Sequence, residues 1–208
     1  MKRILSVIAF VAIICSVQAQ EINWGARLGI NFSKLNGDED SGMKDDYKGR
    51  VGFHIGVAAD YEFRSSMFVE SGLYITTKGV KYDKEGETNK YNVTYLQLPV
   101  LYTYKYDLGN ELKLQGKVGP YAALGLAAKN KYEDSEYPDD NYTDKGFGDG
   151  KDKTGLKRGD FGFLLGIGLS KGHYYLGLNY ELGVLNICAY DDGKVRTRNF
   201  NISLGYNF

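Results

Sequence analysis

The carboxyl-terminal segment of the chain, residues 198–208, alternates without interruption between apolar and small polar side chains. The apolar positions are Phe200, Ile202, Leu204, Tyr206 and Phe208, and the polar positions between them are Asn201, Ser203, Gly205 and Asn207. Successive side chains of a β-strand point to opposite faces, so this pattern predicts a strand with one apolar face and one polar face. The fold must therefore offer this strand two unlike environments.

Further segments upstream show the same period-two alternation, and none shows a convincing helical period. They are residues 22–32, 51–63, 68–81, 96–105, 112–128, 161–170 and 174–183. After residue 19, no apolar run approaches the ~20 residues that a transmembrane helix requires. A chain of this kind that spans a membrane does so as a closed sheet, because lipid leaves an open sheet edge without hydrogen-bond partners. The 27 glycines, 18 tyrosines and 3 prolines are typical of a twisted barrel.

The amino terminus has the pattern of a secretory signal peptide. A basic pair precedes an apolar run over residues 4–17, and Val17-Gln18-Ala19 forms a small-residue cleavage site. We therefore predict a cleaved signal peptide at residues 1–19 and a single barrel domain at residues 20–208.

Cysteine content and charge exclude two further possibilities. Cleavage would remove Cys15 and leave Cys188 alone, so the mature chain has no internal disulfide. The 26 basic and 26 acidic residues are balanced, which argues against a nucleic-acid partner, because such a partner requires a basic surface.

The connections between the alternating segments differ in length in a regular way. Residues 64–66, 107–111 and 171–173 form short turns, whereas the long polar stretches are residues 33–50, 82–94, 129–159 and 186–197. Outer-membrane barrels have short periplasmic turns and long extracellular loops. The expected fold is all-β: an eight-stranded antiparallel up-and-down transmembrane β-barrel. We expect residues 129–159, which have few core-forming side chains, to be a solvated and mobile loop.

The polar face decides between a membrane barrel and a soluble one. A soluble lipocalin-like barrel would turn its apolar face inward around a small ligand. Here the opposite face combines glycines with the ionisable residues Arg27, His54, Asp60, Glu62, Glu70, Lys78, Lys105, Lys117 and Glu181. An eight-stranded interior has room only for side chains, and small or paired polar ones fit it. We therefore predict lipid outside and a plug of mutually compensating charges inside, with a narrow ion path as the alternative.

Several motifs resemble those of one family of barrels. They are Ser71-Gly72-Leu73-Tyr74, Lys78-Gly79, the run from Tyr95-Leu96-Gln97-Leu98-Pro99 to Leu101, Gly119-Pro120-Tyr121 and Gly183. Together they resemble the PorT-like outer-membrane β-barrel family. The resemblance implies an eight-stranded barrel in the outer membrane of a Gram-negative bacterium. Most members have no assigned activity, and one is linked to protein secretion.

The last strand also resembles the final strand of outer-membrane barrels, which the barrel assembly machinery recognises. The resemblance implies that Phe208, Tyr206 and Leu204 form the assembly signal. The expected partners are outer-membrane lipid, the barrel assembly machinery and a protein partner that the sequence does not identify.

Few residues suggest chemistry. His54 faces inward near the loop end of its strand, and Ser33 could lie near it, as in a hydrolase that cleaves lipid acyl chains at the barrel rim. The alternative places His54 in the interior hydrogen-bond network. The acidic residues Glu133, Asp134, Glu136, Asp139, Asp140, Asp144, Asp149 and Asp152 follow no ordered calcium-loop spacing, and lysines are interleaved with them. We predict no catalytic residue, metal or cofactor.

The expected function is a structural or surface-interaction role through the extracellular loops. The alternative is an accessory barrel in secretion or envelope assembly. The third possibility is the lipid hydrolase at the barrel rim.

Overall fold

The computed structural model of the chain describes residues 22–37, 48–84, 87–134, 136, 139, 141–190 and 193–208. The predicted signal peptide lies outside these residues. Nine strands form in the described ranges: β1 (Ile22–Gly37), β2 (Lys48–Arg64), β3 (Met67–Lys84), β4 (Glu87–Gly109), β5 (Leu112–Asp134), β6 (Tyr142–Lys145), β7 (Gly159–Lys171), β8 (Tyr174–Gly183) and β9 (Val195–Asn207). No helix in these ranges is long and apolar enough to cross a membrane.

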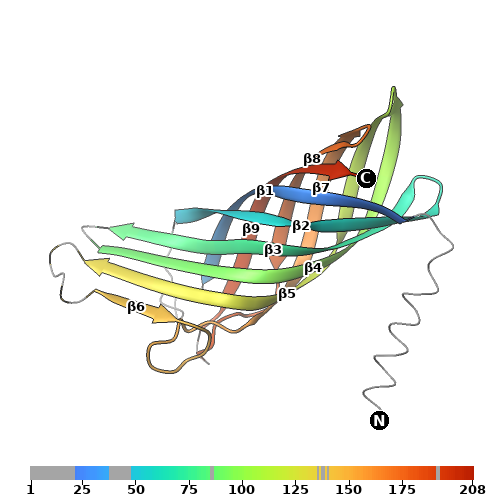
Figure 1. Ribbon diagram of the computed structural model, residues 1–208. Helices are drawn as coiled ribbons and strands as arrows, with labels where there is room; N and C mark the ends of the chain where they lie inside the picture. The colour runs from blue at the N-terminus through green and yellow to red at the C-terminus, as the bar shows by residue number, and fades with distance from the viewer. Residues whose placement is uncertain are drawn as a thin grey trace, which may run out of the picture.

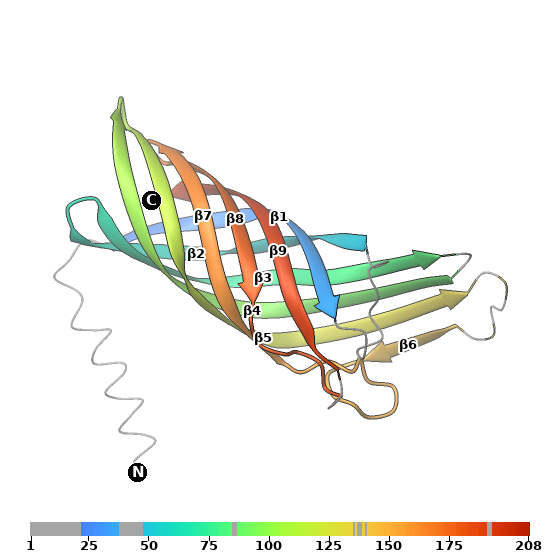
Figure 2. The same ribbon diagram turned by 180° about the vertical axis from the view of Figure 1, so that it is seen from behind.

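All strands except β6 close into one antiparallel ring, which is visible from two sides in Figures 1 and 2. Each strand pairs with the next along the chain, apart from the β5–β7 pairing that skips β6. The first and last strands complete the ring, with Leu28 opposite Leu204 and Phe32 opposite Phe200. Closure gives every ring strand two hydrogen-bonded neighbours, as a sheet in lipid requires. The predicted eight-stranded barrel is confirmed.

Three tight turns lie at one end of the ring. Asn110 and Glu111, between β4 and β5, both have positive φ, as two-residue hairpin turns with type I′ geometry require. Gly172 has a φ of 53° in the β7–β8 turn. The start of β1 and the end of β9 lie beside that turn. Asn207 N–H donates to the His173 carbonyl, and Phe208 N–H donates to the Trp24 carbonyl. The three turns, the start of β1 and the end of β9 therefore lie at the same rim of the barrel, which is the periplasmic rim.

The outward face is apolar and the inward face is small or polar. In β7, buried and exposed residues alternate along the whole strand. Leu165 and Ile167 point outward with 62% and 59% of their surface exposed, and Gly166 and Gly168 lie between and beyond them. Exposure of this extent across every ring strand suits lipid and not water. The soluble-barrel alternative is therefore wrong.

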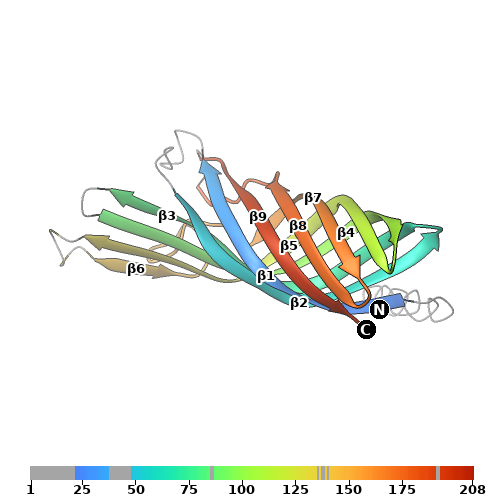
Figure 3. The same cartoon turned by 90° about the horizontal axis from the view of Figure 1, so that it is seen from above.

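Beyond the ring, β3, β4 and β5 continue into a long arm on the side opposite the turns (Figures 1 and 3). Backbone pairing follows the arm to its tip, where Lys84 pairs with Glu87 and Glu87 pairs with Asp134. The short strand β6 pairs with the outer edge of β5, and the rings of Tyr132 and Tyr142 stack at 5.2 Å there. The expectation of loops at residues 82–94 and 129–159 is therefore wrong over residues 82–84, 87–94 and 129–134, which form strands. Both sides of the arm contact solvent, so its strands need no apolar alternation.

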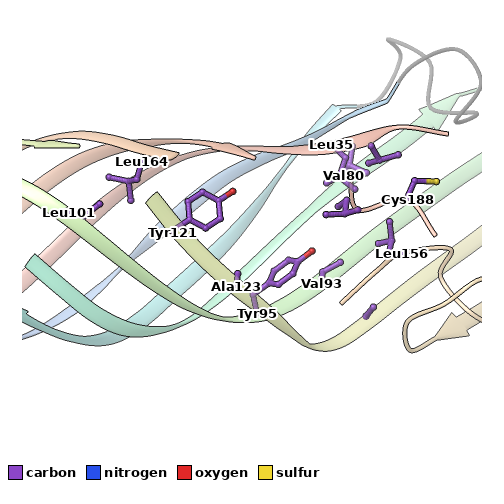
Figure 4. Close-up of a cluster of buried hydrophobic side chains, with 13 residues drawn as sticks. Leu35, Val80, Val93, Tyr95, Leu101, Tyr121, Ala123, Leu156, Leu164 and Cys188 are labelled. Atoms are coloured by element: carbon purple, nitrogen blue, oxygen red, sulfur yellow. The ribbon is translucent and has the colours of Figure 1, made fainter. Parts of the chain in front are cut away.

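An apolar cluster runs along the barrel interior to the extracellular end of the ring, where Leu35, Val80, Leu156 and Cys188 lie near one another (Figure 4). Leu156 and Ile187 come from the two long connections, and they are 2% and 0% exposed. They pack with inward residues near the extracellular ends of the strands, including Val80 and Val93. Backbone hydrogen bonds hold the connections together, for example from Lys157 N–H to the Ile187 carbonyl. The expectation that residues 129–159 form a solvated loop is wrong at Leu156, because this side chain packs in the cluster.

Candidate functional site in the barrel interior

The predicted ionisable residues point into the barrel, with one exception. Arg27, His54, Asp60, Glu70, Lys78, Lys117 and Glu181 are buried, and Lys105 is half-buried. Glu62 is exposed at the periplasmic rim, where its carboxylate accepts a hydrogen bond from Ser66 N–H in the β2–β3 turn. Its assignment to the interior network is wrong, because Glu62 lies beyond the level at which the ring encloses side chains.

The first ion pair lies near the periplasmic end. Lys105 Nζ of β4 is 2.8 Å from Asp60 Oδ2 of β2. The same ammonium lies 3.9 Å from the centroid of the Phe68 ring. Asn23 Nδ2 donates to the other Asp60 oxygen at 3.2 Å. A buried carboxylate persists when charge and hydrogen bonds compensate its desolvation, and both are present here.

A second cluster lies further inside the barrel. Lys117 Nζ of β5 is 2.6 Å from Glu70 Oε2 of β3. Two cations approach the ring of Tyr175, with Lys117 Nζ at 4.5 Å and the Arg27 guanidinium carbon at 4.3 Å. Arg27 also donates to Asn207 Oδ1 at 2.6 Å, so this cluster is linked to the end of β9.

The third cluster is the most deeply buried. Lys78 Nζ of β3 lies 2.7 Å from Glu181 Oε2 of β8 and 3.6 Å from Asp160 Oδ2 of β7. Thr197 Oγ1 donates to the same Asp160 oxygen at 2.9 Å. Tyr121 O–H lies 3.3 Å from that oxygen, and the Tyr121 ring lies 4.5 Å from Lys78 Nζ.

Sequence reasoning missed Asp160, although its parity matches the inward glycines of its strand. It also missed Gln97, whose Nε2 donates to Glu181 Oε1 at 3.0 Å. Uncharged partners such as Gln97 and Thr197 have no charge signal that would identify them in a sequence.

His54 lies between a serine and an asparagine. Its Nε2 is 2.8 Å from Ser203 Oγ, and its Nδ1 is 2.8 Å from Asn31 Oδ1. Gly29 makes room for the imidazole, because a Cβ there would lie 2.5 Å from His54 Cε1. Ser33, the serine that the hydrolase alternative placed near His54, instead donates to the Gly79 carbonyl at 3.0 Å.

The order serine, histidine, asparagine is that of a nucleophile, its base and an orienting group. All three side chains are buried: Ser203 is 5% exposed, His54 is 7% exposed and Asn31 is 0% exposed. The adjoining interior cavity has a volume of about 50 Å³. This space accommodates a few water molecules and no lipid chain.

The first residue of the acidic stretch, Glu133, is paired with two lysines. Glu133 bridges Lys90 and Lys131 on the arm, and its hydrogen bonds to Lys131 and Lys90 lower the pKa of its carboxyl to about 2. In the described part of the chain, no group of three or more His, Cys, Asp and Glu residues could hold a metal ion.

Two residues of the expected assembly signal, Leu204 and Tyr206, lie on the outward face of β9, and the third, Phe208, follows the last residue of the strand. Phe208 is 73% exposed and its ring meets that of Tyr206 edge-on at 5.9 Å. Tyr206 also stacks on His173 at 5.3 Å. Leu204 is 56% exposed on the same face.

A closed ring with an apolar exterior and an ion-paired interior defines an integral outer-membrane β-barrel protein. The family of the outer membrane protein beta-barrel domain matches residues 18–187, and the chain belongs to this family. The protein is accordingly located in the outer membrane of a Gram-negative bacterium, where lipid surrounds the barrel. No curated protein matches the sequence.

Solved structures of small outer-membrane barrels are similar in fold. Neisserial surface protein A is 10% identical with a TM-score of 0.51, over 91% of this chain and 100% of that chain. OprG of Pseudomonas aeruginosa is 13% identical with a TM-score of 0.50, over 91% and 97%. Ail, the attachment invasion locus protein of Yersinia pestis, is 17% identical with a TM-score of 0.46, over 90% and 99%. At these identities the likeness concerns the fold alone.

Proposed function

We propose that this protein is a plugged, non-enzymatic barrel that acts as a structural or surface-interaction protein of the outer membrane. The filled interior is the observation that supports this proposal. Ion-pair clusters at three levels occupy the lumen, and the apolar cluster around Leu156 and Ile187 covers its extracellular end. Over the three levels together, four basic groups are balanced by four acidic groups, so the lumen offers no continuous path of one charge sign.

The arm formed by β3, β4, β5 and β6 supports the surface role. It extends beyond the ring on the extracellular side and has polar side chains such as Lys90, Lys131 and Glu133 on a continuous sheet. A rigid sheet of this kind presents side chains to a partner with little loss of conformational entropy on binding.

A finer assignment within the family is the PorT-like group, which the motif at residues 95–101 supports. That resemblance favours a second candidate function, an accessory barrel for secretion or envelope assembly with a protein partner on the periplasmic rim. A deletion strain distinguishes the two roles. Loss of outer-membrane barrier function with normal secretion supports the first role, and a secretion defect with an intact barrier supports the second.

Planar-bilayer recording tests the plug. The purified protein should give no large, stable conductance steps. A Tyr95→Ala/Tyr121→Ala variant removes two buried rings from the lumen, so it should conduct more and shows that the assay detects an opened barrel. Reproducible large steps from the unaltered protein would contradict the plug.

The absence of enzymatic activity has its own test. A fluorophosphonate probe labels activated serines, and it should not label the folded protein, because Ser203 is enclosed by the ring. Labelling that is lost in Ser203→Ala and retained in Ser170→Ala, another buried serine, would instead establish a hydrolase. Mass spectrometry of lipid A from cells with and without the protein provides an independent measurement.

A further inference from the structure

The outward face of the β1–β9 pair changes from apolar to basic at a single step. Going from the membrane toward the loops, Leu28 pairs with Leu204, Ile30 with Ile202 and Phe32 with Phe200. The next outward pairs are Lys34 with Arg198 and Asn36 with Arg196. We name Lys34, Arg196 and Arg198 the basic ladder.

The basic ladder lies at the level of the lipid headgroups. The Phe32 and Phe200 rings, 6.2 Å apart, mark the upper limit of the apolar band at this position. Outward aromatic residues occupy the interface between hydrocarbon and headgroups. Two residues along a tilted strand advance roughly 5 Å along the membrane normal, so Lys34 and Arg198 lie just above the hydrocarbon.

Two residues of the basic ladder, Arg196 and Arg198, line an open groove. Asn36, Gly37, Lys194, Arg196 and Arg198 line this groove, whose volume is about 360 Å³. Arg198 is anchored, because its Nη1 donates to the Gly183 carbonyl at 2.8 Å and to the Thr197 carbonyl at 3.1 Å. Within the described ranges, Lys34 and Arg196 make no ion pair with an acidic side chain.

We propose that the basic ladder binds the phosphate groups of a phosphorylated glycolipid headgroup of the lipid A type in the outer leaflet. Arginine presents a planar fork of donors that matches a phosphate, and basic clusters beside a membrane span attract anionic headgroups. The basic ladder directly continues the lipid-facing residues of β1 and β9, from Leu28 and Leu204 to Phe32 and Phe200. This position favours a lipid over a soluble anion as the ligand. The acyl chains of the same molecule would lie on Phe32, Phe200 and the leucines below them.

Binding can be measured on the purified full chain in nanodiscs of phosphatidylcholine, by native mass spectrometry with titrated bis-phosphorylated lipid A. The test variant is Lys34→Gln/Arg196→Gln, which leaves the anchored Arg198 in place. Basic residues near an anionic surface contribute enough attraction for two of them to change affinity by roughly 10- to 30-fold. We expect a loss of that size, together with equally weak binding of dephosphorylated lipid A to both proteins.

A charge-matched control is Lys113→Gln/Lys171→Gln, which removes two exposed lysines at the periplasmic rim. This control should bind lipid A as the unaltered protein does. Equal affinity of the test variant and the unaltered protein would overturn the proposal, and so would an equal loss in the control. Complete displacement of lipid A by millimolar inorganic phosphate would identify a soluble-anion site in place of a lipid site.

The acidic residues at 38–40 and 191–192 adjoin the ladder in sequence and lie outside the described residues. If the ladder served only to pair with them, the test variant would lose folding stability and keep its affinity for lipid A. Urea unfolding of the same variant measures that stability, and this combination of results would overturn the proposal.

Discussion

Lys78 and Glu181 form an ion pair that crosses the whole lumen, with Nζ and Oε2 2.7 Å apart. Lys78 belongs to β3 and Glu181 to β8, and these strands lie on opposite sides of the ring. Both side chains are almost fully enclosed, at 1% and 4% exposure. The pair therefore links two walls that share no backbone hydrogen bond, and it fixes the distance between them.

Replacing Lys78 with methionine should destabilise the barrel by about 3–5 kcal/mol, because Glu181 and Asp160 would remain as uncompensated buried carboxylates. Urea titration of the protein folded in liposomes measures this change. Lys90→Met is the matched control, since the Lys90 pair with Glu133 is well exposed and should contribute at most about 1 kcal/mol.

The double variant Lys78→Met/Glu181→Gln tests whether the loss comes from the unpaired charge. Removing both charges should recover a measurable part of the stability, so the two changes should not add. A double variant whose destabilisation equals the sum of the single variants would contradict the role assigned to the pair.

Much of the barrel could be predicted from the sequence because lipid and lumen impose opposite demands on adjacent residues. Alternation located every ring strand, and the ionisable residues of one parity identified the inward face. Lys78 and Glu181 were therefore both recognised as interior residues. Which acid meets which base depends on the register and stagger of the closed ring, so the pairing itself could not be read from one sequence.

The errors have a physical explanation as well. The arm could not be predicted from the sequence, because β4 and β5 beyond the ring have solvent on both sides. Strands in such a position do not show the alternation of apolar and polar residues that identifies a strand. Leu156 and Cys188 come from different connections, and only the folded barrel brings them together. Asp160 lies one residue before the first apolar residue of its segment, and strand ends are the least certain part of such predictions.

The two faces of the barrel should respond differently to substitution. Leu165→Arg puts a charge on the lipid face near the middle of β7, and it should cost about 2–4 kcal/mol of folding free energy in a bilayer. Asn179→Ser, on the inward face of β8, removes a 2.8 Å hydrogen bond to Asn201 Oδ1 and should cost about 1 kcal/mol. Urea titrations of both variants in liposomes give the comparison, and the reverse order would mean that the faces are assigned backwards.

The apolar cluster at the extracellular end should hold the long connections in place. Leu156→Ala would leave a cavity in the cluster and weaken the local packing by about 2–5 kcal/mol. The expected result is faster proteolysis within residues 146–158, with the ring still resistant. Leu126→Ala, which removes an exposed side chain from the outer face of β5, is the control and should leave this cleavage rate unchanged. Equal protection of the connection in both variants would show that Leu156 does not anchor it.

Two deletions at the carboxyl terminus can distinguish recognition by the assembly machinery from closure of the barrel. Phe208 contributes one backbone hydrogen bond, from its N–H to the Trp24 carbonyl at 2.9 Å, and its side chain is largely exposed. Residues 200–208 also include most of the pairing of β9 with β1 and β8. Deleting Phe208 should therefore reduce outer-membrane levels in cells and still allow the purified protein to fold in detergent.

Deleting residues 200–208 should prevent folding in both settings, because β1 and β8 would then have open edges whose unsatisfied backbone groups cost several kcal/mol each in lipid. Immunoblots of outer-membrane fractions and heat-modifiable mobility on gels measure the two outcomes. Phe208→Tyr keeps an aromatic terminus and should restore the outer-membrane level. Normal abundance of the Phe208 deletion would show that the terminal aromatic residue is not the signal read by the assembly machinery.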